Sequence, residues 1–161
     1  MKKILITVVS VLFLFSCKKT SVPGSNSSLT ETIDGTNYSA SQQKTITRNR
    51  QPNDSTEYFM ISGFDGTGNY IEIGLESNHN LTTKTYTQSA DSSVLVDIYF
   101  QGVSNVNPYL SIYSSTNPAS ITITHIDSTS IQGTFTGIIY DMGDSTQDSK
   151  TVTNGKFTLT N

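Results

Sequence analysis

A shortage of cysteine is the first limit that this sequence sets on its own structure and chemistry. The 161 residues include one cysteine, Cys17, so the chain cannot form an internal disulfide or a cysteine-based metal site. It has no tryptophan, the commonest aromatic platform for sugars, and its formal net charge of −3 disfavours nucleic-acid binding. Ordinary apolar packing must therefore stabilise the folded part.

The N-terminal apolar run has the three parts of a bacterial export signal in the right order. Two lysines precede an apolar segment over residues 4–15, and Ser16 places a small residue directly before Cys17. A membrane-spanning helix needs about 20 apolar residues, so this segment is too short to span. It has the length of a signal h-region. The pattern predicts a signal peptide over residues 1–16 and a lipobox in which Cys17 is acylated.

An ordinary secretory signal followed by a coincidental cysteine is the alternative. A secreted protein that uses cysteine for stability normally carries an even number of them. Here Cys17 stands alone, at the position where the lipid would be attached, which favours a lipoprotein. Phe15 departs from the pattern, because it is bulkier than the residue usually found there.

The residues after Cys17 bear on where the anchored chain is located. No aspartate follows the cysteine, so the inner-membrane retention pattern is absent and we expect the outer membrane. Lipoproteins exposed on the cell surface resemble one another in carrying acidic residues just after the cysteine. Here the first acidic residue after Cys17 is Glu31, so we expect the periplasmic face rather than the cell surface. Loss of residues 1–16 removes two lysines and no acidic side chain, which changes the formal net charge from −3 to −5.

The mature chain divides into a tether and one domain. Residues 17–28 include Pro23 and Gly24 and offer nothing to bury, which is typical of a flexible tether. Residues 29–161 are enough for a single domain with its own core. Threonine is abundant there and favours strands, whereas few segments show helical spacing of apolar residues.

Alternating apolar residues and turn signals predict about nine or ten antiparallel strands. Asp34-Gly35 indicates a tight hairpin. Asn154-Gly155 indicates either a second hairpin or a bulge inside one long last strand, and we favour the bulge because residues 150–160 then pair along all of 130–140. We expect strands over residues 29–33, 36–38, 43–49, 57–62, 70–75, 94–100, 109–113, 120–126, 130–140 and 150–160, and a long loop over residues 76–93 with at most a short strand around Thr85.

An all-β chain without helical crossovers can bury one face of each sheet as a two-layer sandwich or as a closed barrel. Short strands and irregular loops favour an antiparallel two-layer β-sandwich over a lipocalin-like β-barrel. Glycines inside the strand at residues 130–140 predict a bend or a close backbone approach.

Three segments together resemble an uncharacterised family of small β-rich lipoproteins from Bacteroidota. They are TIDGTNYSA near the start, SITITHIDSTSIQGTFTGIIYD later, and VTNGKFTLT at the end. The resemblance spans nearly the whole mature chain, and its motifs are structural. It implies a β-rich fold and an envelope location, and it brings no activity.

No group of residues specifies a reaction. His79 and His125 fall in different segments, and the loop containing Asp141, Asp144 and Asp148 lacks the glycine and glutamate positions of an EF-hand. Residues 65–69 match turn chemistry better than a cation cage. We therefore expect no catalytic residue, no metal site and no cofactor, with Cys17 as the one functional residue.

The expected function is that of a lipid-anchored envelope protein with a non-enzymatic interaction or structural role. The membrane would be contacted through the lipid, and the partner would be an envelope protein or a glycan. A glycan- or small-ligand-binding accessory protein is the alternative, in which exposed tyrosine rings stack on sugars. Most of the eight tyrosines are expected to be half-buried sheet residues instead. An envelope hydrolase is a distant third, because the chain has no G-x-S-x-G sequence.

Overall fold

The computed structural model describes residues 27–50, 56–90, 93–105, 107–111, 117–143 and 148–160, with residues 42–50 described as backbone only. The expected signal peptide (residues 1–16), the acylation site Cys17 and most of the tether lie outside the described residues. Within the described ranges, no helix is both long and apolar enough to cross a membrane.

The described part of the chain consists of eleven antiparallel strands and contains no helix, which confirms the all-β prediction. The eleven strands exceed the expected nine or ten, because the segment expected to be a long loop contains the short strand Thr85–Thr87. The expected strands are all present, several of them one or two residues longer than predicted; the strand expected at residues 109–113 is described as far as Ser111. The strands are β1 (Ser28–Ile33), β2 (Thr36–Ser39), β3 (Gln42–Arg50), β4 (Glu57–Phe64), β5 (Tyr70–Ser77), β6 (Thr85–Thr87), β7 (Val94–Gln101), β8 (Tyr109–Ser111), β9 (Ser120–Ile126), β10 (Ser130–Asp141) and β11 (Ser149–Thr160).

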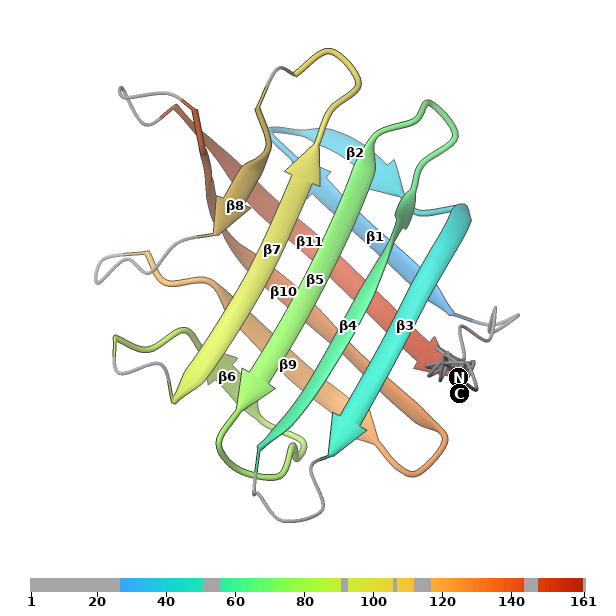
Figure 1. Ribbon diagram of the computed structural model, residues 1–161, viewed down its shortest axis with the longest axis vertical. Coiled ribbons are helices and arrows are strands. Elements are labelled where there is room, and N and C mark those ends of the chain that lie inside the picture. The colour runs from blue at the N-terminus through green and yellow to red at the C-terminus, as the bar shows by residue number, and fades with distance from the viewer. Residues whose placement is uncertain are drawn as a thin grey trace, which may run out of the picture.

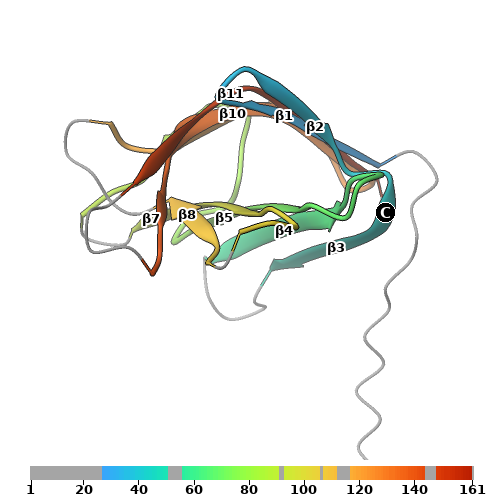
Figure 2. The same ribbon diagram turned by 90° about the horizontal axis from the view of Figure 1, so that it is seen from above.

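The strands form one strongly curled sheet with the order β2-β1-β11-β10-β8-β7-β5-β4-β3. Two short strands share one edge of β10: β9 pairs with its first half and β8 with its last three residues. β8 then pairs with β7, so it carries the sheet from one half to the other. Strands β3, β4, β5 and β7 lie in front of β1, β10 and β11 (Figure 1), and the two halves face each other when seen from above (Figure 2).

The first hairpin has the predicted turn. Asp34 and Gly35 both adopt positive φ angles, 47° and 84°, as a two-residue hairpin turn requires. The backbone N–H of Asp34 donates to the carbonyl of Thr151, and the carboxylate of Asp34 accepts from the N–H of Thr151. These two bonds tie the turn to the neighbouring strand β11.

The last strand contains the predicted bulge. β10 and β11 pair from Ser130 with Thr160 to Tyr140 with Ser149, and their register shifts at Asn154. Asn154 has a φ of 52°, a left-handed conformation that asparagine tolerates better than most residues. The bulge interpretation of Asn154-Gly155 is therefore confirmed.

Apolar side chains from both halves meet in one core. Phe59 on β4 stacks on Phe157 on β11 with ring centroids 5.1 Å apart, and Tyr38 on β2 meets Phe100 on β7 edge to face at 4.9 Å. These contacts join strands from opposite halves of the sheet. The largest fully buried side chains are Tyr86, Phe59, Leu29, Ile61, Ile71, Ile73, Leu75, Ile98, Ile121, Ile123, Ile131 and Ile139.

The folded domain begins slightly earlier than the sequence indicated. Ser27 is 3% exposed, and its hydroxyl accepts a hydrogen bond from the N–H of Thr160 at 3.0 Å. Ser28 begins β1 and pairs with Thr158. Ser28 therefore belongs to the sheet and Ser27 is bonded to its last strand, although the sequence assigned residue 28 to the tether.

Candidate functional site

The outer surface of one half of the sheet carries rows of short polar side chains. One row follows the register from β6 through β9, β10, β11 and β1 to β2, and a second row lies beside it. None of these side chains is buried. We call this surface the hydroxyl face and define it as Thr85, Thr122, Thr134, Lys156, Thr30 and Ser39 in the first row, and Thr87, Ser120, Thr136, Thr153, Asn154, Thr32 and Asn37 in the second.

Strand periodicity explains why these residues share one surface. In β1, Leu29 and Ile33 are buried, so the side chains of Thr30 and Thr32 point outward. The bulge in β11 turns two consecutive residues, Thr153 and Asn154, toward solvent. The outward row therefore stays continuous where β11 crosses it.

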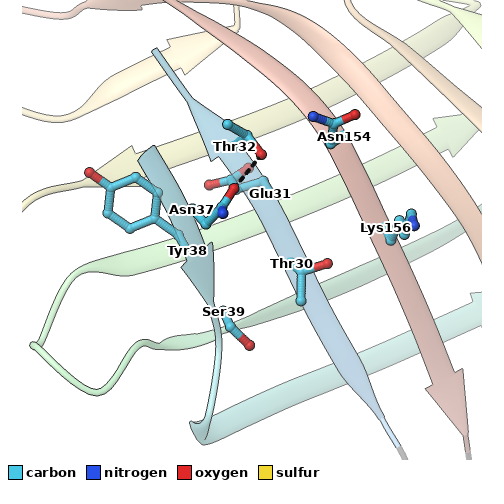
Figure 3. A pocket seen from close by; sticks show the side chains of 8 residues that line it. All are labelled: Thr30, Glu31, Thr32, Asn37, Tyr38, Ser39, Asn154 and Lys156. Carbon is cyan, nitrogen blue, oxygen red and sulfur yellow. Dashed lines mark hydrogen bonds between the residues drawn. The ribbon is translucent and has the colours of Figure 1, made fainter. Parts of the chain in front are cut away.

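Two hollows lie on the hydroxyl face. The first, of about 400 Å³, is bordered by residues of β1, β2 and β11, and Thr32 donates a 2.8 Å hydrogen bond to the amide oxygen of Asn37 at its side (Figure 3). The second, of about 310 Å³, is bordered by residues of β9, β10 and β11. Asn154 and Lys156 border both hollows, so they lie at the junction between them.

Lys156 differs from the other lysines whose side chains the structure describes. Lys150 lies 3.5 Å from the carboxylate of Asp34 and over the ring of Tyr109, and Lys84 lies over the ring of Tyr86. Among the described residues, Lys156 has no ion pair and no aromatic partner. Its ammonium group is thus available to a ligand.

A buried carboxyl group lies beneath the first hollow. Glu31 is 3% exposed, and neither of its oxygens has a hydrogen-bond partner in the described part of the chain. Burial raises the pKa of Glu31 to about 8, so this side chain is protonated and neutral at pH 7. Our sequence reasoning missed it. The signal was the strand alternation, which puts Glu31 on the same face as Leu29 and Ile33.

The outer surface of the other half has a different chemistry. Phe64 and Tyr70 meet edge to face with centroids 5.1 Å apart, and Tyr70 and Tyr99 do so at 5.7 Å. The hydroxyl of Tyr70 donates a 2.6 Å bond to Glu72. Burial, and then the nearby charge of Glu72, raise the pKa of Asp97. This surface combines aromatic rings with carboxylates.

A third hollow, of about 200 Å³, lies on this aromatic surface. It forms over Gly74, which has no side chain to fill it, and Tyr58, Met60, Leu95 and Asp97 are among its lining residues. Tyr38, Tyr58, Tyr70, Tyr99 and Tyr140 are partly buried, and Tyr86 and Tyr109 are buried. The prediction of mostly half-buried tyrosines is confirmed for the described ones; Tyr113 lies outside the described residues.

The two histidines lie on different elements of the fold. His79 is an exposed loop residue and His125 an exposed strand residue, as the sequence indicated. The ring of His125 lies 2.9 Å from the carboxylate of Asp127. Asp127 in turn accepts bonds from Thr129 and from the N–H of Ser130, and these bonds hold its pKa well below the usual range. Within the described ranges, no three His, Cys, Asp or Glu side chains are placed to hold a metal ion.

The acidic turns are stabilised internally. Asp65 accepts from the N–H groups of Thr67 and Asn69 and from both of their side chains, at 2.8 to 3.0 Å. In the other loop, Asp141 accepts from the N–H of Gly143, and Asp148 accepts from the hydroxyl of Tyr109. Asp144 lies outside the described residues. The carboxylate of Asp65 is therefore engaged in its own turn, as the sequence predicted.

Comparisons with protein-family models, with curated proteins and with solved structures find no match to this chain. The resemblance to β-rich lipoproteins of Bacteroidota remains a prediction from the sequence.

Proposed function

We propose that this chain is a lipid-anchored protein of the cell envelope that acts by binding and catalyses no reaction. Cys17 carries the lipid, the residues after it form the tether, and the domain stands at the periplasmic face of the outer membrane. The order of basic, apolar and small residues before the lone cysteine supports the anchor.

The hydroxyl face is the observation that carries the binding role. Its side chains lie on six strands, and the described part of the chain leaves those of Thr30, Ser39, Thr134 and Asn154 without intramolecular hydrogen bonds. Threonine hydroxyls on strands have few rotamers, so their positions are largely fixed before a ligand arrives. A surface of fixed donors and acceptors suits recognition of a polar partner.

A role as a glycan- or small-ligand-binding accessory protein is the second candidate, and the hollows favour it. Their volumes of about 400 and 310 Å³ lie within the range of about 300–1,000 Å³ that is typical of small-molecule sites. Hydroxyl and amide groups can both donate to and accept from sugar hydroxyls. The tyrosines on the opposite surface offer a further stacking platform.

For the fold itself we propose the two-layer sandwich, in preference to a closed barrel. The stacked pair Phe59 and Phe157 and the edge-to-face pair Tyr38 and Phe100 support this proposal, because both pack one half of the sheet directly on the other.

Two experiments test the proposed function. In membrane fractionation, a Cys17→Ala variant should move from the envelope pellet to the soluble fraction. A variant that pellets as fully as the wild type would refute the anchor. Glycan titration of the soluble domain, residues 21–161, should give heat above background, and its absence would refute the glycan-binding candidate.

A further inference from the structure

We propose that the hydroxyl face binds an acidic oligosaccharide, with the ligand's anionic group over Lys156 and its sugar rings in the hollows on either side. This inference rests on the glycan-binding candidate and adds the charge and the placement of the ligand.

The arrangement of the hollows supports a ligand of several rings. Both are bordered by Asn154 and Lys156, which lie two residues apart on β11. The first hollow extends from this junction toward β2 and the second toward β9. A chain of rings that crosses the junction would fill both hollows, whereas a single ring would leave one of them to water.

Charge supports an anion at the junction. Lys156 is the only charged member of the hydroxyl face as defined above, on a chain whose formal net charge is −3. Glu31 lies beneath the first hollow and is uncharged at pH 7, so it does not neutralise the lysine. Charges elsewhere on the protein are screened over about 8 Å at physiological ionic strength. The local charge at the junction is therefore positive.

The chemistry of the face argues for a saccharide among anionic ligands. Protein interfaces depend on a few large anchors such as tryptophan, tyrosine and arginine. The hydroxyl face consists of short polar side chains around one lysine. A nucleic acid would require several cations to neutralise its phosphates. Sugar hydroxyls, in contrast, match the density of hydroxyl and amide groups on this face.

The backbone fixes the junction in position. Asn154 adopts its left-handed conformation in the bulge, between pairs that β11 forms with β1 and β10. Thr30 and Thr134 pair with Lys156 from the two sides. Because the partners of Lys156 are strands of one sheet, the distances between the donor groups change little when a ligand binds.

A matched pair of ligands tests the inference. Full-length protein extracted in mild detergent is titrated at pH 7 with tri-galacturonate and with its fully methyl-esterified form, which has the same rings without the charges. Tri-mannuronate and its ester form a second pair, and inorganic sulfate serves as a ring-free anion. The acidic trimers should bind about tenfold more tightly than their esters, and this preference should weaken with added salt.

Substitutions locate the contact. Lys156→Gln should abolish the preference for the acid, whereas Lys84→Gln, which removes an exposed lysine elsewhere, should preserve it. Circular dichroism and the urea midpoint check that both variants are folded.

Four results would contradict the inference. Esters that bind as tightly as the acids, or an unchanged preference in folded Lys156→Gln, would overturn the acidic ligand and leave glycan binding in place. Sulfate that competes equally with the acidic trimers would reduce the site to an anion site without ring recognition. No binding of any of the four trimers would overturn this inference together with the glycan-binding candidate.

Discussion

Phe157 on β11 lies directly across from Gly133 on β10, and its ring covers the place where a side chain of residue 133 would stand. A Cβ atom at Gly133 would lie 2.7 Å from the Cζ atom of Phe157 and would also collide with the carbonyl oxygen of Thr122. The reverse pair lies two residues along: Phe135 faces Gly155, where a Cβ atom would lie 2.6 Å from the ring. Each glycine thus makes room for a core aromatic on the neighbouring strand.

Gly133→Ala should destabilise the domain by about 2–3 kcal/mol, because neither the Phe157 ring nor the Thr122 backbone can move without disturbing the core. The free energy of unfolding in urea measures this loss. Gly66→Ala is the matched control, since a Cβ atom there meets nothing within 4 Å. Equal stability of the two variants would show that the close approach at Gly133 does not exist.

The burial of Glu31 predicts an unusual dependence of stability on pH. Its folded-state pKa of about 8 lies above the ordinary value of 4.5, so the folded protein holds this proton more tightly than the unfolded chain does. The resulting stabilisation is complete below about pH 4.5, decreases as the pH rises, and is lost above about pH 8. Its size is at most about 4–5 kcal/mol.

Glu31→Gln removes the titration, so the stability difference between this variant and the wild type should change by several kcal/mol between pH 5 and pH 9. Urea unfolding at pH 5, 7 and 9 measures that difference. A constant difference would refute the burial of a protonated carboxyl group.

Ser111 completes the hydrogen bonding where the sheet passes from one half to the other. Its hydroxyl accepts from the N–H of Ile98 and donates to the carbonyl of Val96, both at 2.9 Å, and the residue is 5% exposed. Ser111→Ala should cost about 1–3 kcal/mol in unfolding free energy, because two buried backbone groups lose their partner. Ser39→Ala, on the surface, should change it by less than about 0.5 kcal/mol. A Ser111→Ala loss no larger than that would contradict the bridging role.

Asp65 organises the turn between β4 and β5. Burial alone would raise its pKa, but hydrogen bonds from Asn69 and Thr67 outweigh this effect and lower it. Asp65→Ala should destabilise the domain by about 2 kcal/mol, and Asp65→Asn by less, because the amide keeps one oxygen acceptor. Because the pKa is lowered, the stabilisation by Asp65 is present above about pH 4 and is lost on acidification. An Asp65→Asn variant as unstable as Asp65→Ala would contradict this graded account.

Local signals account for what could be predicted from the sequence. Asp34-Gly35 indicated the first hairpin, Asn154-Gly155 the bulge, and the alternation from Val94 to Phe100 a strand. The pairing of β8 with both β7 and β10 could not be predicted, because three residues carry no register information. The alternation of residues in β1 places Glu31 on the buried face. The energetic cost of burying its carboxyl group becomes evident only from the structure, in which neither oxygen has a hydrogen-bond partner among the described residues.

The sequence by itself determined the secondary structure, the tight turns and the expected position of the lipid anchor, since each depends on residues that are neighbours along the chain. Only the tertiary structure decided which threonines share a surface, that Lys156 lies between two hollows, and that Glu31 is enclosed without a hydrogen-bond partner among the described residues. These properties arise from pairing between strands far apart in sequence, where a shift of one residue would move each side chain to the opposite face of the sheet.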